Sequence, residues 1–338
     1  MKLGLVLGGG GLVGMGYHAG AIKALEEWGV DASAADVIVG TSAGSVIGSY
    51  LAAGWKPADF YAYAQGEHPQ SRREERSQRD EVDGIFTPLW SSRNERVRRS
   101  IGSFFALASS RGYWRRATQG RTPGAPLRHT FPAGMYSTAE TKLRLHEDLP
   151  DAWPRDGVYI CAVDLYTGER VPFGHPDAPT ATFPEAVLAS VAIPGVFPPV
   201  RIGDRQYVDG GAFSATSLDL AANAGCDAII CIAPLGYKSD SLVAARDPKV
   251  WGPMVLRGLF ARALKREVVA ARARGIQVFV VRPWLTDLKS HGTNSMRHFD
   301  RAEFTENARS ATLRLLEDNA DNGALKAFAK SAPKVKAG

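Results

Sequence analysis

Short apolar segments alternate with longer segments whose apolar residues recur at helical spacing. The short segments, bounded by glycine, proline or aspartate, predict buried strands at residues 2–7, 36–39, 157–165, 205–208, 228–233 and 276–281. The longer segments predict helices at residues 15–28, 45–53, 57–65, 186–192, 248–274 and 301–319. Because strands alternate with helices along the chain, the pattern favours an α/β fold with a mainly parallel sheet covered on both faces.

Two predicted helices begin with a capping box, in which Ser or Thr is followed three residues later by Glu. Ser137 and Glu140 predict the start of a helix that runs to His146. Thr182 and Glu185 predict the start of the next helix in the same way.

The segment at residues 36–54 combines a strand, a sharp turn and a helix rich in small residues. The turn, Gly40-Thr-Ser-Ala-Gly44, is a Gly-x-Ser-x-Gly motif. A serine at its centre has a strained backbone, which requires small residues two positions before and two positions after. Its hydroxyl then lies near the helix N-terminus, whose amides favour developing negative charge. A chance glycine-serine loop is the alternative, but the flanking strand and helix favour Ser42 as a nucleophile.

A glycine-rich loop, residues 8–14, directly follows the first predicted strand. Backbone N–H groups of such a loop can point together at one anion. Gly9-x-Gly11-x-x-Gly14 matches the dinucleotide fingerprint, but the next strand ends at Gly40 and lacks the acidic residue that binds ribose. No Lys-Ser or Lys-Thr follows the glycines, which excludes a P-loop. An oxyanion hole is therefore favoured, because it complements the serine turn.

The composition is typical of a globular protein and argues against a membrane-spanning or secreted one. The chain has 338 residues, of which 45% are hydrophobic and 22% charged, as in a globular protein with two domains or one large α/β domain with an insertion. No apolar run approaches the ~20 residues needed to cross a bilayer. The first strand is too short for a signal peptide, and Cys161, Cys226 and Cys231 have no metal-ligand spacing. A cytoplasmic location is therefore expected.

Residues 67–135 differ in charge from the rest of the chain. Between Ser71 and Thr130 there are thirteen arginines, no lysine and six acidic residues, a net charge of +7. An apolar run at 101–108 lies between arginines and aromatic residues. This composition suits either a lid with peripheral contact to anionic membranes or a solvated insertion whose helix packs on the core. No nucleic-acid partner is expected, because no recognised nucleic-acid module accompanies the arginines.

The glycine loop, the Gly-x-Ser-x-Gly turn and Tyr207-Val-Asp-Gly-Gly211 follow one another in a fixed order. Together with Ala189-Ser-x-Ala-x-Pro194 and Phe197-Pro-Pro199, they resemble the patatin-like phospholipase family. The resemblance implies a three-layer α/β/α fold, a Ser–Asp catalytic dyad and hydrolysis of lipid acyl esters. It covers most of a domain expected at residues 1–320, with a lid-like insertion at about 67–135 and a C-terminal tail at 321–338. No cofactor or metal is expected.

The resemblance also assigns roles to individual residues. It implies that Ser42 is the nucleophile and that Asp209 is its partner. The glycines expected in the oxyanion hole are Gly9, Gly10 and Gly11. The glycines that complete the motifs are Gly14, Gly40, Gly44, Gly210 and Gly211. Val13 departs from the family pattern, because many members carry Arg or Lys at this position.

Chemistry supports the same pair. A serine hydroxyl needs a base to take its proton, and Asp209, which ends a strand before two glycines, is expected to have an accessible carboxylate. In a triad with the α/β-hydrolase order only His291 and His298 come late enough, and both are expected in a surface loop. His18 is expected to pack within the first helix. Two functions stay open: a serine lipid acyl hydrolase (phospholipase A, lysophospholipase or esterase), and a catalytically weak lipid-binding or effector module that retains the fold.

Overall fold

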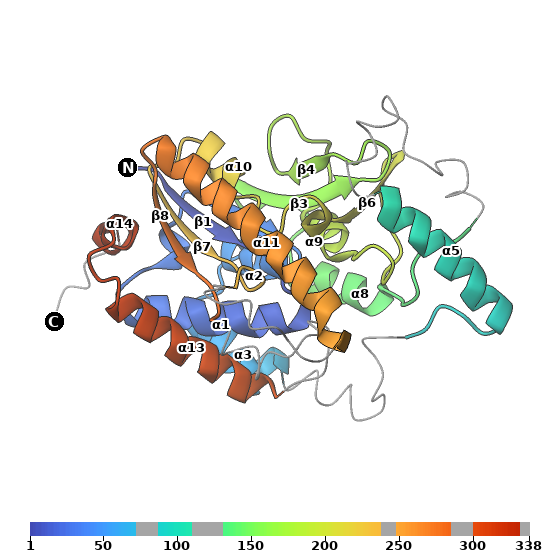
Figure 1. Ribbon diagram of the computed structural model, residues 1–338, viewed down its shortest axis with the longest axis horizontal. Coiled ribbons are helices and arrows are strands. Elements are labelled where there is room, and N and C mark those ends of the chain that lie inside the picture. The colour runs from blue at the N-terminus through green and yellow to red at the C-terminus, as the bar shows by residue number, and fades with distance from the viewer. Residues whose placement is uncertain (72–86, 110–130, 238–247, 285–299, 332–338) are drawn as a thin grey trace. The chain divides into compact units, whose positions relative to one another are not determined.

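The computed structural model describes residues 1–71, 87–109, 131–237, 248–284 and 300–331 (Figure 1). The chain divides into two compact units. The first contains Met1–Arg72 and Ala215–Gly338, and the second contains Arg73–Ser214. Of the described helices, none is both long enough and apolar enough to span a membrane.

The first unit contains a parallel sheet in the order β2-β1-β7-β8. Its strands are β1 (Leu3–Leu7), β2 (Val37–Thr41), β7 (Ala228–Ile232) and β8 (Gln277–Val281). Every residue of β1, β2 and β7 is buried. Continuous burial is typical of a parallel sheet with helices on both faces, and it explains the unbroken apolar runs in these strands.

Helices cover this sheet. The helices of the first unit are α1 (Gly11–Glu27), α2 (Ala43–Ala52), α3 (Pro57–Ala64), α10 (Leu218–Asn223), α11 (Pro248–Ala273), α13 (Arg301–Glu317) and α14 (Gly323–Ser331). α1 packs against α2, α3 and α13, whereas α10 packs against α11 and the strands. Figure 1 shows α1, α3 and α13 grouped below the strands and α11 in front of them. The predicted fold class, a three-layer α/β/α arrangement with a mainly parallel sheet, is confirmed.

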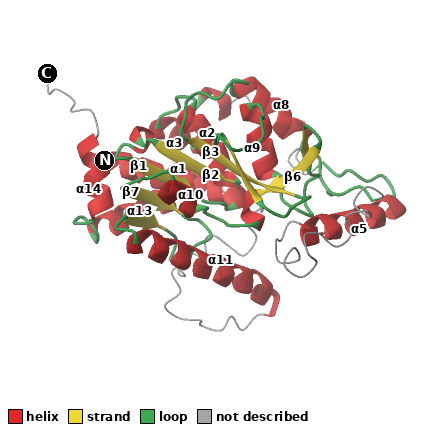
Figure 2. Cartoon of the chain, turned by 90° about the horizontal axis from the view of Figure 1, so that it is seen from above, coloured by secondary structure: helices red, strands yellow, loops and turns green. Residues whose placement is uncertain are grey.

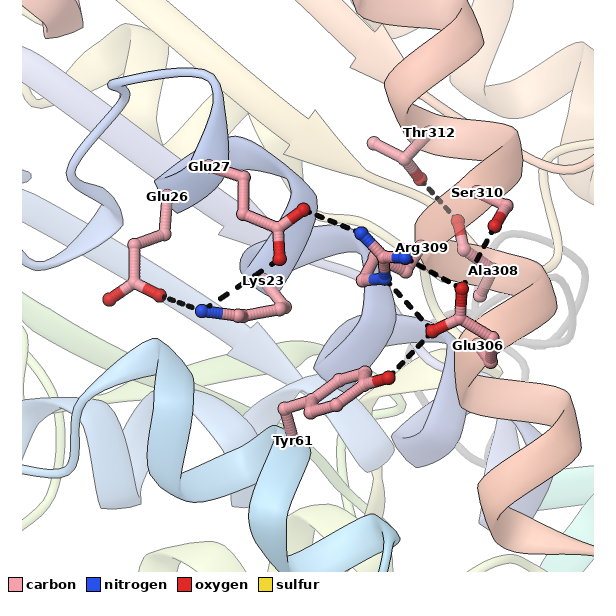
Figure 3. Close-up of polar contacts among 9 residues, drawn as sticks. All are labelled: Lys23, Glu26, Glu27, Tyr61, Glu306, Ala308, Arg309, Ser310 and Thr312. Atoms are coloured by element: carbon pink, nitrogen blue, oxygen red, sulfur yellow. Dashed lines mark hydrogen bonds and ion pairs between the residues drawn. The ribbon is translucent and has the colours of Figure 1, made fainter.

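Helices α1 and α13 cross closely at Gly20, where a Cβ atom would overlap the carbonyl oxygen of Thr305. A polar network joins α1, α3 and α13 beside this crossing (Figure 3). Arg309 donates to Glu27 over 2.6 Å and to Glu306 over 2.7 Å, and the Tyr61 hydroxyl donates to Glu306 over 2.6 Å. These hydrogen bonds, above all those from Arg309, lower the pKa of Glu306 to about 2.

The sequence predicted a C-terminal tail at residues 321–338, but residues Gly323–Ser331 form helix α14. This helix contacts β7 and β8, and its side chains Ala324, Leu325, Ala327 and Phe328 belong to the main hydrophobic core. The segment is only nine residues long and contains Gly323 and Lys326, so the sequence alone did not distinguish a short packed helix from a tail. Residues 332–338 lie outside the described part of the chain.

The second unit has antiparallel strand pairs. β3 (Val158–Asp164) pairs with β4 (Arg170–Phe173) and with β6 (Arg205–Asp209), and β6 also pairs with β5 (Val200–Ile202). The turns before β4 and β6 contain Gly168 (φ 68°) and Gly203 (φ 60°). Glycine adopts this left-handed backbone without a steric penalty, which allows such short connections. The parallel arrangement expected from the sequence therefore belongs to the first unit.

Three helices accompany these strands: α5 (Arg93–Ser109), α8 (Ala139–Asp148) and α9 (Phe183–Val191). α9 packs on β3, β5 and β6, and α8 packs on α9. α5 lies along the outside of the unit in both views (Figures 1 and 2). The apolar run at 101–108 thus lies in a helix, as expected for a packed insertion, whereas residues 110–130 lie outside the described part of the chain.

The two predicted capping boxes differ in outcome. Thr182 and Glu185 exchange hydrogen bonds at the start of α9, so that box is confirmed. At α8 the prediction is wrong, because the N-cap is Thr138. Glu140 therefore comes one position too early to reach back to the cap, and it pairs instead with Arg144 at 2.6 Å. The helix itself is present and extends beyond His146.

Candidate active site

The turn around Ser42 has the strained geometry that its sequence predicts. Ser42 has φ 53° and ψ −122°, a conformation that residues with side chains rarely adopt. It links the end of β2 to the start of α2, and its carbonyl accepts hydrogen bonds from the amide (2.8 Å) and hydroxyl (2.6 Å) of Ser45. The surrounding bonds therefore hold the strained residue in place. Its side chain is buried and lies at the N-terminus of α2.

The two motif glycines beside Ser42 are required by close packing. A Cβ atom on Gly40 would lie 2.6 Å from the Cα of Ser45. A Cβ atom on Gly44 would overlap the carbonyl oxygen of Leu7, at the end of β1. The steric reason expected for the Gly-x-Ser-x-Gly spacing therefore holds on both sides of the serine.

The glycine loop lies directly beside this turn. A Cβ atom on Gly9 would lie 3.4 Å from the Cβ of Ser42. At the start of α1, a Cβ atom on Gly10 would lie 2.7 Å from the Cα of Gly14, and one on Gly14 would lie 3.3 Å from the Cβ of Ala43. The N-termini of α1 and α2 thus come together next to Ser42, and both helix dipoles favour negative charge there.

The loop amides are not equivalent. Gly8 donates to the carbonyl of Ile232 over 2.8 Å, and Gly9 donates to the carbonyl of Ala215 over 2.7 Å. The amide of Gly9 therefore holds the loop to the fold and is not aimed at a ligand, which corrects its expected role as a donor. α1 begins at Gly11, and the first amides of a helix have no carbonyl partner within it. Gly10, the N-cap of α1, and Gly11, its first residue, are consequently the candidates for oxyanion donors in the loop.

His18 fixes the same loop from α1. Its Nε2 lies 2.7 Å from the carbonyl oxygen of Gly8, and the side chain is fully buried. Burial lowers the pKa of His18 to about 4, against the opposing effect of this hydrogen bond. The imidazole is therefore neutral at pH 7 and donates from Nε2. The sequence correctly placed His18 in the helix packing, but it missed the contact with the loop.

Val13 is buried in the main core. The basic residue that the resemblance leads us to expect at this position is replaced by an apolar one, which adds no charge beside the glycine loop.

Asp209 ends β6 in the second unit. Its Oδ1 accepts a hydrogen bond from the Gly211 amide over 2.7 Å, and its own amide donates to the carbonyl of Ala192 over 2.9 Å. A Cβ atom on Gly210 would overlap the carbonyl oxygen of Cys161. The side chain is buried, and α9 packs on β6. The accessible carboxylate expected from the sequence is therefore wrong, and the aspartate is instead firmly oriented.

The C-terminal end of α9 supports Asp209. Ser190 donates to the carbonyl of Cys161 in β3 over 2.6 Å, and Ala192 accepts from the Asp209 amide. This explains why the Ala-Ser-x-Ala-x-Pro motif accompanies the aspartate in the sequence. The alternative bases His291 and His298 lie outside the described residues. Among the described residues, no group of His, Cys, Asp and Glu could hold a metal ion.

Comparison with known proteins identifies relatives of the chain. It is 27% identical over 236 residues to an uncharacterized NTE family protein of Mycobacterium tuberculosis, covering 68% of this chain and 30% of that protein. It is also 27% identical over 230 residues to lysophospholipase nte1 of Aspergillus fumigatus, covering 68% of this chain and 12% of that protein. The chain thus spans less than a third of the length of either relative.

Among solved structures, VipD from Legionella pneumophila aligns with 94% of this chain and 66% of its own, with a TM-score of 0.43 and 14% sequence identity. A family model described as patatin-like phospholipase matches residues 5–222, a range that includes the glycine loop, Ser42 and Asp209. The chain belongs to the patatin-like phospholipase family.

Proposed function

We propose that the chain is a serine-dependent lipid acyl hydrolase that cleaves carboxylic esters through an acyl-enzyme on Ser42. The observation that carries the proposal is the strained backbone of Ser42 beside a glycine loop, where two helix N-termini meet. Strain of this kind persists only where the surroundings enforce it, and it gathers at active sites. Family membership supports lipid hydrolysis in general, and the fungal relative named a lysophospholipase supports the same class.

In the proposed mechanism Asp209 takes the proton of the Ser42 hydroxyl as the oxygen attacks the ester carbonyl. The amides of Gly10 and Gly11 bind the negative charge that develops on the carbonyl oxygen. The alcohol then leaves with the proton from Asp209, and the acyl group stays on Ser42. A water molecule, deprotonated by Asp209, attacks the acyl-enzyme, and the proton passes from Asp209 to the Ser42 oxygen as the fatty acid is released.

The substrate is proposed to be a phospholipid, a lysophospholipid or another lipid-like ester. A second candidate, a catalytically weak lipid-binding or effector module, is favoured by Val13. Without a basic residue at this position, the glycine loop depends on backbone amides and on His18 for its order.

The test is a hydrolysis panel of phospholipids, lysophospholipids and short-chain aryl esters. We expect Ser42→Ala and Asp209→Asn each to lower kcat/KM by roughly 10³-fold or more, with little further loss in the double variant, because residues that act as one unit are not additive. Asp204→Asn, an exposed aspartate in the turn before β6, is the matched control and keeps wild-type activity.

Labelling by a fluorophosphonate checks the same assignment independently of substrate. Wild type should be labelled on Ser42 without added metal. Wild-type protein that hydrolyses none of these esters and is not labelled would favour the lipid-binding module instead. Loss of activity in a His291 or His298 variant equal to that in Ser42→Ala would replace the dyad by a triad.

A further inference from the structure

In the part of the chain that the structure describes, helix α5 packs on the second unit through one face. On this inner face Gly102, Ser103 and Ala106 are buried. A Cβ atom on Gly102 would overlap the carbonyl oxygen of Pro132, and the Ser103 hydroxyl accepts from the Gly134 amide over 2.9 Å. Ala106 packs with core residues of β3 and β6. This close fit fixes which face of α5 points outward.

The outer face carries large apolar side chains. Val97, Ile101 and Phe104 expose 53%, 37% and 66% of their surface. Their spacing of four and three residues places them on one side of the helix. Leu107 extends this stripe, and a shallow hollow runs along it. A contiguous exposed stripe of this kind differs from isolated surface apolar residues and marks an interaction site.

Arginines border the stripe. α5 carries four arginines and one glutamate, a net charge of +3. Arg96 and Arg98 are exposed and lie about 100° to either side of Val97 around the helix axis. Glu95 lies away from the stripe and pairs with Arg99 at 3.6 Å. The charges beside the stripe are therefore all positive.

We propose that the outer face of α5 docks on an anionic phospholipid surface. Apolar residues flanked on both sides by arginines are the pattern of an interfacial helix, in which the apolar face enters the headgroup boundary and the cations stay with the lipid phosphates. A nucleic acid would leave Phe104 and Ile101 without an apolar environment. Docking of this kind would bring a lipid hydrolase to its substrate. The role of the docking therefore rests on the proposed function, but the binding to lipid does not.

Binding is measured by flotation of the full chain with vesicles of phosphatidylcholine, with and without phosphatidylglycerol. The Ser42→Ala background keeps the vesicle lipids intact. We expect binding to the anionic vesicles that weakens as salt is raised. The pair Arg96→Gln and Arg98→Gln should weaken it about 25-fold, from about fivefold for each arginine near the surface. Phe104→Ser should weaken it by roughly tenfold.

Matched controls come from α11. Arg262→Gln with Arg266→Gln removes two exposed arginines, and Leu259→Ser removes an exposed apolar side chain. Both should leave vesicle binding unchanged. In the wild-type background, Arg96→Gln with Arg98→Gln should slow hydrolysis of vesicle lipid and leave a soluble aryl ester unaffected, because none of the proposed catalytic residues is altered.

Three results would overturn the proposal. One is equal binding to neutral and anionic vesicles. Another is no vesicle binding at all, which would favour a protein partner for the stripe. The third is a joint loss of thermal stability and soluble-ester hydrolysis in Phe104→Ser, which would show that the stripe packs on the chain itself. Vesicle binding without hydrolysis in the wild type would instead contradict the proposed function and leave the docking face intact.

Discussion

The loop and turn around Ser42 and the outer face of α5 differ in how far their surroundings restrict them. At Gly10, Gly40 and Gly44 not even one added carbon atom fits. On α5, by contrast, a phenylalanine keeps two thirds of its surface exposed at position 104. The first region is determined by backbone packing inside the fold. The second contributes little to folding, so its apolar residues need an explanation outside the fold.

The strongest expected effect is in the first region. Gly44→Ala should lower the free energy of unfolding by more than ~3 kcal/mol, because its Cβ would overlap the backbone of Leu7 and neither chain segment can move freely. Gly258→Ala, in open space on α11, is the control and should raise stability by about 0.5 to 1 kcal/mol. Urea unfolding measures the stability of both variants. Equal stability would contradict the claim that backbone packing leaves no room for a side chain at Gly44.

Because His18 holds the glycine loop beside Ser42, its titration makes the free energy of unfolding depend on pH. Its pKa is lowered to about 4 in the folded chain from an ordinary value of 6.5. The folded state therefore binds fewer protons than the unfolded state, and stability is lost as the pH falls from about 6.5 to 4, by roughly 3 kcal/mol in all. We expect this loss in wild type and its absence in His18→Gln.

Glu306 makes stability depend on pH in a lower range than His18 does, so the two effects can be told apart. Its pKa is lowered to about 2 from 4.5, so the stability it contributes is present above pH 4.5 and is lost as the pH falls toward 2. Glu306→Gln should therefore lower stability above pH 4.5 and remove the pH dependence between pH 4.5 and 2, while leaving the slope between pH 6.5 and 4.5 that His18 causes. A wild-type protein with constant stability between pH 6.5 and 4.5 would contradict the neutral, buried state of His18.

The sequence could predict the turn around Ser42 because its requirements are local. Gly40, Ser42 and Gly44 lie within five residues. Their spacing alone therefore indicates that a side chain at either glycine would collide with the backbone of the turn or its neighbours. The role of the Gly9 amide could not be predicted, because its acceptor is Ala215, far away in the sequence. The burial of Asp209 was missed for the same reason, since it depends on the packing of α9, a segment outside the motif, on β6.

The backbone of Ser42 also stores strain that can be released. Ser42→Gly should raise the free energy of unfolding by about 1 kcal/mol, because glycine adopts φ 53° without a steric penalty. Esterase activity should be lost in the same variant, whereas Ser42→Ala should lose activity without this gain in stability. Chemical unfolding of the three proteins under one condition measures the difference. A glycine variant less stable than the alanine variant would show that the turn is not strained.

The smallest expected effect is at the outer face of α5. Phe104→Ser should change the free energy of unfolding by less than ~0.5 kcal/mol, because an exposed side chain loses little contact when it is shortened. Phe183→Ser, at a fully buried position of the same unit, is the matched control and should cost more than ~3 kcal/mol. Urea unfolding in the absence of lipid measures both. If the two substitutions cost the same, the stripe on α5 would be part of the core, and its exposed apolar residues would need no partner.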